Sequence, residues 1–352
     1  MGQLLWTAHI PKRHRLYSRY AKRSERFAEL SADRNSNAET GKVVRARESS
    51  CAPGDELPTC SRAVLLTQAL ATRTLADPRP FVARTGLPVG LQLYTLGETA
   101  DTDLEAALTQ VARIGFKTVE LAGFRADQAA GARAAADDAG LHITSVHLGP
   151  EAKDGYPGLG DDPGRLAASV QTLSAIVVVL PGPLLQYSRN KPPPARLEDW
   201  KRTAAFLNER GAALGREGLL LAYHNHNPEF APVDNTMGFN LIAHETEPTL
   251  VKFEMDVGGV CAAGWGPLVL LNRYPGRFRL MHVKDNTAST HVKFEWMMES
   301  TEVGDGIIDW PCVIAAAYQT GVMQYFVEQE PPFKKDRSAS IAESFGFSSS
   351  MP

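Results

Sequence analysis

The segment GLLLAYHNHNPEF, residues 218–230, ends a short apolar run in two imidazoles and two amides. His224 and His226 could ligate a metal ion or move a proton, since imidazole does both near neutral pH. The aliphatic run before them follows a glycine, which predicts a strand buried on both faces. Polar residues at the carboxyl end of such a strand are typical of sites in parallel α/β folds. An isolated pair could equally well be one core histidine and one surface histidine. The residues at the ends of the other predicted strands distinguish a functional site from this alternative.

Similar side chains recur where other predicted strands end. These residues are Tyr94, Glu120, His147, Asp256, His282 and Glu328. In a closed parallel barrel the carboxyl ends of all strands meet at one mouth, so residues far apart in the sequence become neighbours. Buried charges are costly unless they are paired. A divalent cation would satisfy several of these side chains together.

The elements that must position these residues begin at residue 87, where apolar and amphipathic segments start to alternate. Segments 89–96, 117–124, 141–150, 175–182, 219–223, 249–259, 277–286 and 323–330 are predicted strands. Segments 101–116, 126–140, 162–174, 195–218, 237–246, 265–276, 309–321 and 338–345 are predicted helices. Eight such units in about 260 residues predict an α/β fold of the (β/α)₈ TIM-barrel type. An open doubly wound sheet is the alternative, but no G-x-G-x-x-G follows the first strand.

Residues 1–86 differ in composition from the predicted barrel. Residues 1–86 begin with the basic run PKRHRLYSRYAKRSERF and continue into a segment without periodicity, which predicts a largely disordered N-terminal extension. Residues 61–85 have some features of an export signal, although Arg73 and Asp77 interrupt them. The chain as written is expected to be cytoplasmic, or periplasmic if this segment is a signal behind a misplaced start. The predicted domains are the extension 1–86, the barrel 87–345 and a frayed tail 346–352.

Charge and hydropathy limit the partners. The formal net charge is −3 over 352 residues, which argues against a dedicated nucleic-acid binder. No apolar run approaches the roughly 20 residues of a membrane span. The expected partner is a small molecule, with no nucleic acid and no membrane span, and a homo-oligomer is left open.

Several of these segments together resemble a known family. LQLYTL, VELAGF, YHNH, FEMDVGGVCAAG, HVKD, EVGDGIIDW and YFVEQE are similar to the sugar phosphate isomerase/epimerase group of xylose isomerase-like TIM barrels. The similarity spans residues 87–333, and the ordered set is more specific than any single fragment. The resemblance implies a carbohydrate substrate and one divalent metal ion, commonly manganese, held by side chains on the last four strands.

The resemblance also implies a ligand set. Carried over position by position, the ligands are Asp256, His282 and Glu328 on strands six to eight. The strand-five ligand falls on His224, where the epimerases usually have glutamate. Two imidazoles with two carboxylates suit Mn²⁺, Zn²⁺ or Fe²⁺ better than Mg²⁺, and Mn²⁺ is the first expectation. Strand alternation returns His226 to the side of His224, where it could touch substrate or orient a ligand.

The implied reaction is isomerisation or epimerisation of a sugar or keto sugar through an enediolate. Glu328, His226 and His147 are the expected catalytic acids and bases. Because His224 replaces one of the two epimerase glutamates, dehydration of a keto sugar or cyclitol, as in inosose dehydratase, is the alternative. A non-catalytic sugar-binding barrel is the third reading. Nuclease activity is not expected, because nucleases of this superfamily need a histidine at the position of Gly259.

Four further residues are expected to bind substrate: Glu120, Tyr94, Lys284 and Glu302. Lys284 follows His282 and could contact a hydroxyl or phosphate, but a surface lysine paired with Asp285 is an equal alternative. Glu302 lies in the glycine-rich loop that follows the seventh strand, and glycines allow a loop to approach a ligand closely.

Overall fold

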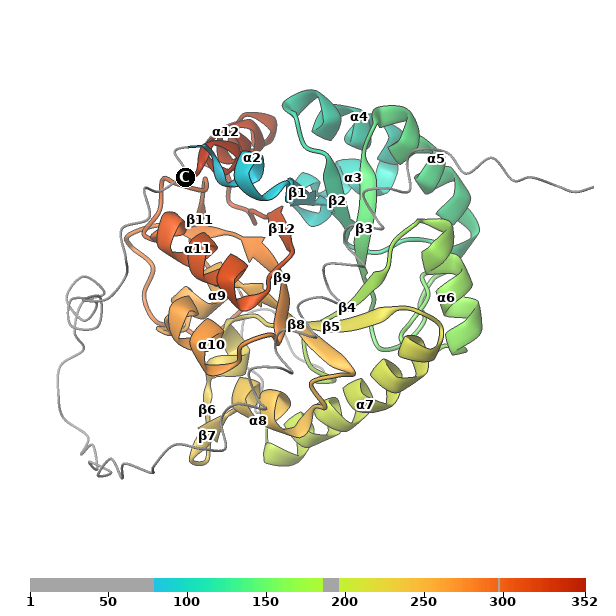
Figure 1. Cartoon of the computed structure of the whole chain (residues 1–352), viewed down its shortest axis with the longest axis vertical. Coiled ribbons are helices and arrows are strands. Elements are labelled where there is room, and N and C mark those ends of the chain that lie inside the picture. Colours follow the sequence, from blue (N-terminus) through green and yellow to red (C-terminus); the bar gives the residue numbers. More distant parts are fainter. Residues whose placement is uncertain (1–78, 186–195, 297) are drawn as a thin grey trace, which may run out of the picture. The chain divides into compact units, whose positions relative to one another are not determined.

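The computed structural model describes residues 79–185, 196–296 and 298–352. Contacts divide the chain into the units Met1–Ala76 and Asp77–Pro352, and every described residue belongs to the second. That unit is a closed barrel of parallel strands in the order β1-β12-β9-β8-β5-β4-β3-β2, surrounded by helices (Figure 1). The predicted (β/α)₈ fold is therefore confirmed. The predictions for residues 1–78, including most of the export-like segment, lie outside the described residues.

The barrel strands are short, and each falls within a predicted segment or extends it by one residue. They are β1 Val89–Gln92, β2 Thr118–Leu121, β3 His142–His147, β4 Val177–Pro181, β5 Leu220–His224, β8 Val251–Asp256, β9 Phe278–Val283 and β12 Gln324–Val327. Two small hairpins pair β6 Pro232–Val233 with β7 Thr236–Met237 and β10 Asp285–Asn286 with β11 Ser300–Thr301. The pairing of β1 with β12 closes the barrel, with Val89 opposite Tyr325.

The helices begin and end at residues suited to those positions. They are α2 Phe81–Thr85, α3 Glu98–Thr102, α4 Leu104–Ile114, α5 Ala129–Ala139, α6 Pro163–Thr172, α7 Leu197–Arg216, α8 Gly238–Glu245, α9 Val257–Ala262, α10 Pro267–Arg273, α11 Trp310–Thr320 and α12 Arg337–Ser350. Asp162 accepts a hydrogen bond from the Arg165 amide at the start of α6, for example, and Gly140 ends α5 with a positive φ of 72°. Within the described part of the chain, no helix has both the length and the apolar character needed to cross a bilayer.

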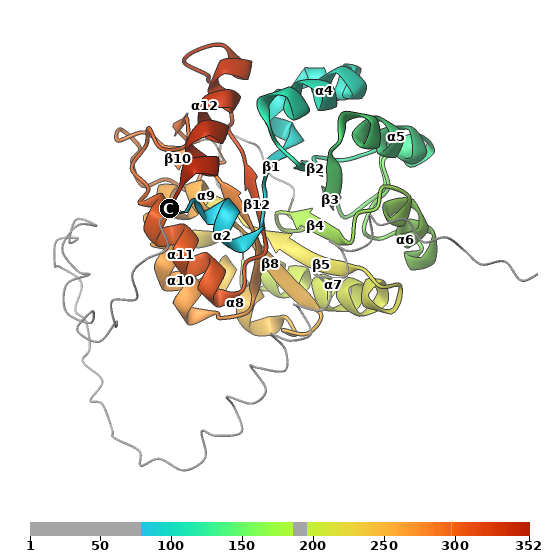
Figure 2. The ribbon, with the colours of Figure 1, turned by 45° about the horizontal axis from the view of Figure 1, so that its top comes forward.

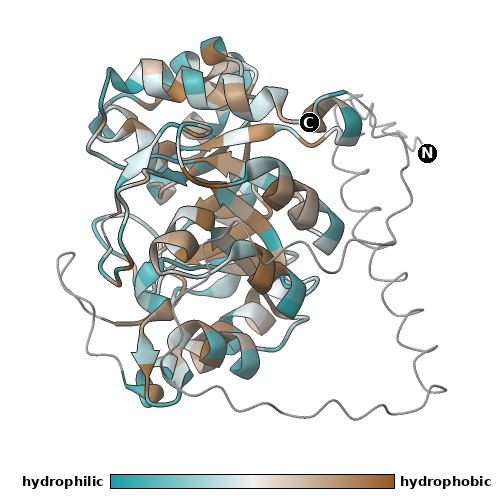
Figure 3. Cartoon of the chain, turned by 90° about the vertical axis from the view of Figure 1, so that its left-hand side faces the viewer, coloured by the Kyte–Doolittle hydropathy of each residue, from teal (hydrophilic) through white to brown (hydrophobic). Residues whose placement is uncertain are grey.

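The middle of the barrel interior is lined by apolar side chains, and the end at which the strands reach their carboxyl termini is lined by polar ones. Val177, Val179, Ala222, Leu280 and Phe326 form a buried apolar cluster on β4, β5, β9 and β12. Figure 3 shows the hydropathy along the ribbon, with hydrophobic colour prominent on the central strands and mixed colours on the helices. Because side chains alternate along a strand, Ala222 and His224 point to the same side of β5, as do Leu280 and His282 of β9. Strands β5 and β9 therefore carry apolar packing residues first and an imidazole near the carboxyl end.

Both predicted boundaries of the barrel need correction. Helix α2 belongs to the barrel unit although it lies within the predicted extension, and α12 continues to Ser350. Met351 is only 2% exposed, and its carbonyl accepts a hydrogen bond of 2.7 Å from the Phe81 amide. Figure 2 shows α2 beside α12. Residues 346–351 are thus packed rather than frayed, because burial of α12 against α2 and β12 stabilises them.

The loop between β9 and α11 is organised by one carboxylate. Asp285 accepts hydrogen bonds from the Gly304 amide at 3.1 Å, the Ile308 amide at 3.3 Å and the Trp310 indole at 2.8 Å. Gly306 passes so close that a Cβ atom there would overlap Asp285 Oδ1. Close packing against Asp285 therefore requires glycine at position 306.

Candidate active site

The strand ends bring together a buried group of side chains, called here the polar cluster. Its members are Glu120, His147, His224, Glu254, Asp256, His282, Lys284 and Glu328. They come from β2, β3, β5, β8, β9 and β12 or from the residue that follows the strand. His147 is the most exposed of them, at 8%. The sequence-predicted residues at these strand ends therefore do converge.

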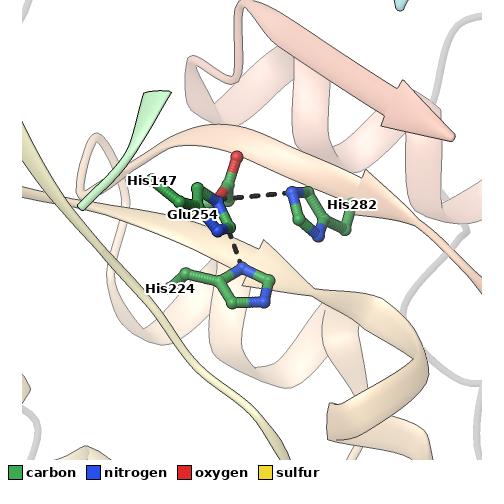
Figure 4. Close-up of side chains that lie close together, drawn as sticks. All are labelled: His147, His224, Glu254 and His282. Atoms are coloured by element: carbon green, nitrogen blue, oxygen red, sulfur yellow. Dashed lines mark hydrogen bonds and ion pairs between the residues drawn. The ribbon is translucent and has the colours of Figure 1, made fainter. Parts of the chain in front are cut away.

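Glu254 is at the centre of the cluster, and the sequence analysis missed it. Its Oε2 atom lies 3.0 Å from His147 Nε2, 3.2 Å from His224 Nδ1 and 3.4 Å from His282 Nε2 (Figure 4). Glu254 is two residues before Asp256 on β8 and so points to the same side of the strand. That spacing was visible in the sequence, but only the last residue of the strand was considered.

Glu120 supports the imidazoles from β2. Its Oε1 atom lies 2.7 Å from His282 Nε2 and 3.0 Å from His147 Nε2, and it accepts a hydrogen bond from Gln92. Its Oε2 atom accepts a hydrogen bond of 2.6 Å from Ser145. The carboxylate of Glu120 is thus fully occupied by protein groups, which suits the positioning of His147 and His282 better than the expected contact with substrate.

A second part of the cluster is built around Lys284. This lysine is completely buried, and its Nζ atom lies 3.1 Å from Glu328 Oε2, 3.1 Å from Glu330 Oε1 and 3.6 Å from Asp256 Oδ2. The alternative of a surface lysine paired with Asp285 is wrong. Lys284 was not recognisable as buried from the sequence, because its three partners come from β8 and from the segment after β12.

Burial and neighbouring charges raise the pKa of two histidines in the cluster and lower the pKa of the third. Burial alone would lower the pKa of His147, but the carboxylates of Glu120 and Glu254 raise it to about 9. Burial also opposes ionisation of His282, yet Glu254 and Glu328 raise its pKa well above the usual range. Burial and the charge of His282 lower the pKa of His224 instead. Without an ion, His147 and His282 are therefore cationic and His224 is neutral at pH 7.

The pKa values of three carboxyl groups in the cluster are shifted as well. Burial and the charge of Glu120 would raise the pKa of Glu254, but the neighbouring histidines hold it at about 2. Burial raises the pKa of Asp256 despite the nearby Lys284 ammonium. Burial would also raise the pKa of Glu328, yet Lys284 and His282 keep it well below the usual range.

His226 lies beside the cluster. Its ring centroid is 4.6 Å from that of His224 and 4.0 Å from that of Trp296. Burial and the Lys284 charge lower its pKa, so it is neutral at pH 7. Its Nδ1 atom has no hydrogen-bond partner among the described residues.

Among the described residues, neither Tyr94 nor Glu302 makes a hydrogen bond or ion pair with a member of the polar cluster. Tyr94 follows β1 and is 42% exposed. Glu302 is buried, but its carboxylate accepts a hydrogen bond of 2.6 Å from Ser340 of α12 and lies 3.7 Å from Lys335. The structure therefore gives Glu302 a role in holding its loop against α12, and no described contact brings it to the polar cluster.

A cavity of about 640 Å³ lies beside α3, α4 and α5. Phe124, Arg125 and Tyr156 are among its lining residues, and no member of the polar cluster lines it. This cavity is separate from the candidate site.

The cluster fits a divalent metal ion. Two overlapping groups have ligand atoms within 4.8 Å of one another, namely His147, His224, Glu254 and His282, and His224, Asp256 and Glu328. His224 Nδ1, Glu254 Oε1 and Asp256 Oδ2 are buried and have no hydrogen-bond partner among the described residues. Unsatisfied buried donors and acceptors are costly, and a cation would compensate these atoms. Three of the four predicted ligands share one group, whereas His282 lies in the other.

Comparisons with known proteins agree with this architecture. The inosose dehydratase of Lacticaseibacillus casei is 26% identical over 147 residues, which are 38% of this chain and 49% of that protein. That of Clostridium beijerinckii is 31% identical over 123 residues, which are 32% of this chain and 41% of that protein. The chain thus spans about half the length of the curated relatives it matches.

Among solved structures, a sugar phosphate isomerase/epimerase of Parabacteroides distasonis is 26% identical, with a TM-score of 0.62 over 76% of this chain and 95% of that chain. A 3-keto-D-glucoside 4-epimerase of E. coli is 14% identical, with a TM-score of 0.55 over 74% of this chain and 98% of that chain, and shows the fold alone. Residues 108–350, more than half of the chain, match the family model described as xylose isomerase-like TIM barrel. The chain belongs to the family of xylose isomerase-like TIM barrels.

Proposed function

We propose that this protein is a metal-dependent isomerase or epimerase that abstracts a proton beside the carbonyl of a keto sugar. The observation that carries the proposal is the neutral imidazole of His226 beside a buried cluster with two overlapping metal-binding groups. Proton abstraction next to a carbonyl needs a base and a positive charge near the developing oxyanion. The proposal assigns the base to His226 and the positive charge to the ion that the neighbouring strand-end side chains would hold.

The ion would be held by the imidazoles and carboxylates of the two groups, which share His224. When bound, such an ion polarises a carbonyl and its neighbouring hydroxyl. All four residues of the predicted set, namely His224, Asp256, His282 and Glu328, have ligand atoms in these groups. Mn²⁺, Zn²⁺ and Fe²⁺ are all compatible with mixed nitrogen and oxygen ligands.

The proton steps are assigned to the side chains of the chain itself. His226 takes the proton from the carbon next to the carbonyl, which leaves an enediolate. Return of the proton to the neighbouring carbon gives the isomer, and return to the opposite face of the same carbon gives the epimer. Glu328 and His147 are the further candidates for the returning acid, although both are held by protein partners. Tyr94 is exposed and is the proposed contact for a sugar hydroxyl.

A dehydratase is the second candidate, because the inosose dehydratases are among the relatives of this chain. The first step is the same, but the enediolate then expels a β-hydroxyl group. That group leaves as water after protonation by an acid. His224, which replaces a glutamate of the epimerases, removes the symmetric pair of carboxylates and so favours this outcome over 3-epimerisation.

Incubation with keto sugars and cyclitols in D₂O separates these reactions. An isomerase or epimerase gives a product of unchanged formula with deuterium next to the carbonyl. A dehydratase gives a product lighter by one water. A binding protein gives no product but gains thermal stability with sugar, and that outcome would refute the proposal.

The variant His224→Glu tests the role of the fifth strand. It should keep the metal ion and raise any 3-epimerase side activity if His224 has replaced the second epimerase base. Loss of metal without that gain would refute the analogy to the 3-epimerases.

A further inference from the structure

We propose that Asn227 and Trp296 are positioning residues for the imidazole of His226. Asn227 anchors the segment of residues 287–296, and Trp296 of that segment packs against the His226 ring and fixes its direction. The inference rests on the proposed function, because it concerns the side chain to which that proposal assigns the proton transfer. It also gives a role to the second amide of the sequence HNHN, which follows His226 directly.

The 287–296 segment is anchored at two points. It follows β10 in the loop after β9. The side chain of Asn227 is completely buried, and its Nδ2 atom donates hydrogen bonds to the Lys293 carbonyl, at 3.2 Å, and to the Glu295 carbonyl. The Lys293 amide donates a further hydrogen bond of 3.0 Å to the Ala262 carbonyl at the end of α9. The two bonds from Asn227 therefore fix the backbone at the end of the segment.

The last residue of this segment, Trp296, lies against the imidazole of His226. The two ring centroids are 4.0 Å apart, and the ring planes are inclined by 55°. His224 packs edge-on against the same imidazole, with centroids 4.6 Å apart and planes inclined by 89°. Tilted and edge-on contacts between aromatic rings are attractive. The His226 ring therefore has two aromatic contacts that restrict its rotation.

Ring packing matters here because no hydrogen bond of Nδ1 fixes the His226 imidazole in the part of the chain that the structure describes. A catalytic base is commonly oriented by a third group, and His282 shows such an arrangement, with Glu328 Oε2 3.0 Å from its Nδ1 atom. A misplacement of about 1 Å can lower the rate of a reaction by about 10²-fold. For His226 the orienting contact is therefore assigned to Trp296.

A double-mutant cycle on the whole metal-loaded protein tests this role, with the substrate found by the D₂O experiment. Trp296 is only partly buried, so its replacement leaves the core intact. Trp296→Ala should lower kcat by about 10- to 100-fold with little change in KM, and the aromatic variant Trp296→Phe should retain most of the activity. In the His226→Ala background, Trp296→Ala should have no further effect, because a residue that acts through His226 then has nothing to position.

The outcomes of the cycle separate the inference from the proposed function. If His226→Ala is impaired but Trp296→Ala lowers kcat by the same factor in both backgrounds, the inference is overturned and the proposed function stands. A raised KM with unchanged kcat in Trp296→Ala would make Trp296 a substrate contact and would also overturn the inference. An unimpaired His226→Ala would refute the assignment of the base itself.

The variant Asn227→Leu tests the anchor with a side chain of similar shape that has no N–H to donate. It should lower kcat by about the same 10- to 100-fold as Trp296→Ala and leave the metal content unchanged. Asn208→Leu is the matched control, because Asn208 of α7 also donates from Nδ2 to a backbone carbonyl, that of Glu245, at 2.8 Å. The control should keep the wild-type kcat. Equal kcat values for Asn227→Leu and wild type would overturn the role of Asn227.

Modification of His226 by diethyl pyrocarbonate, located by mass spectrometry, gives a readout that needs no substrate. The reagent acylates accessible neutral imidazoles, and the His226 side chain is buried. Modification should be slow in wild type and in Asn208→Leu, and several-fold faster in Asn227→Leu and Trp296→Ala. Unchanged rates in the last two variants would overturn the inference. If no sugar is converted at all, the proposed function fails, and this experiment alone decides whether Asn227 and Trp296 hold the ring.

Discussion

Lys284 and Glu328 form a buried ion pair, in which the lysine Nζ atom lies 3.1 Å from the glutamate Oε2 atom and the lysine is completely buried. The pair links the end of β9 to the end of β12. Since Asp256 and Glu330 share the same ammonium, the lysine compensates three carboxylates. Its removal would leave Glu328 with His282 Nδ1 at 3.0 Å, but would leave Asp256 and Glu330 without the ammonium that they share.

The variant Lys284→Met should destabilise the metal-free protein by about 3–5 kcal/mol, as expected when one partner of a buried ion pair is removed. Urea unfolding in the presence of a chelator measures the free energy of unfolding. Lys201→Met is the control, because Lys201 forms an ion pair of 3.2 Å with Glu198 on the surface of α7, and exposed pairs contribute about 0–1 kcal/mol. Equal effects of the two substitutions would contradict the compensating role of Lys284.

The loop around Asp285 should not tolerate a side chain at Gly306. In Gly306→Ala the new methyl group would overlap Asp285 Oδ1, and the hydrogen bonds from Gly304 and Trp310 would have to shift. Loss of such buried, charge-assisted hydrogen bonds costs about 1.5–3 kcal/mol each. Thermal unfolding should show a clear fall in Tm.

The matched substitution Gly346→Ala lies in α12, where a Cβ atom would meet no neighbour within 4 Å. It should stabilise the protein by about 0.5–1 kcal/mol, because alanine favours a helix interior over glycine. A similar loss of Tm in both variants would show that Gly306 is not restricted by Asp285.

Glu229 should make stability fall with rising pH. This residue is completely buried, accepts a hydrogen bond of 2.8 Å from the Tyr223 hydroxyl, and has a pKa raised to about 8 by burial. The folded protein therefore keeps a proton that the unfolded chain releases near pH 4.5. The stabilising contribution is complete below pH 4.5 and is lost as pH rises towards 8.

The variant Glu229→Gln should flatten this dependence and gain stability on the order of a few kcal/mol at pH 8. Unfolding experiments at a series of pH values between 4.5 and 8 give the measurement. An unchanged slope in the variant would mean that Glu229 ionises normally in the folded protein.

His226 should contribute to the reaction without holding the metal. With the substrate found by the D₂O experiment, His226→Ala should lower kcat by about 10²- to 10⁴-fold, the range of general acid–base catalysis. The metal content should stay close to that of wild type. His244→Ala, an exposed histidine on α8, is the control and should leave both quantities unchanged. Parallel loss of metal and activity in His226→Ala would assign His226 to metal binding instead.

The fold was predictable because each strand carries its own local signal. The run before His224 is aliphatic, short and preceded by glycine, and helices such as α6 begin at an aspartate followed by proline. These features act over a few residues, so one sequence is enough to detect them. The end of α12 was misjudged because its burial depends on contact with α2, more than 250 residues earlier in the sequence.

The site was predictable only at the strand ends. Asp256, His282 and Glu328 lie at strand ends, where polar residues are expected at a barrel mouth. Glu254 lies within its strand, and the sequence alone does not show whether its side chain faces the barrel interior or the surface. Side-chain alternation places Glu254 on the inner side, but only the closed barrel brings it against imidazoles of β3, β5 and β9. The burial of Lys284 depends on three acidic partners in the same way.

The closure of β1 against β12 has a consequence for the order of folding. Val89 pairs with Tyr325, and His282 contacts Glu120 across 162 residues of sequence. During synthesis from the N-terminus, the first strand lacks its closing neighbour until almost the whole chain has been made. Such long-range pairing slows folding, because loop entropy is lost before the contacts form. The imidazoles and carboxylates can therefore assemble only after the last strand is available, and a nascent chain that lacks β12 should not capture the metal ion in the mature site.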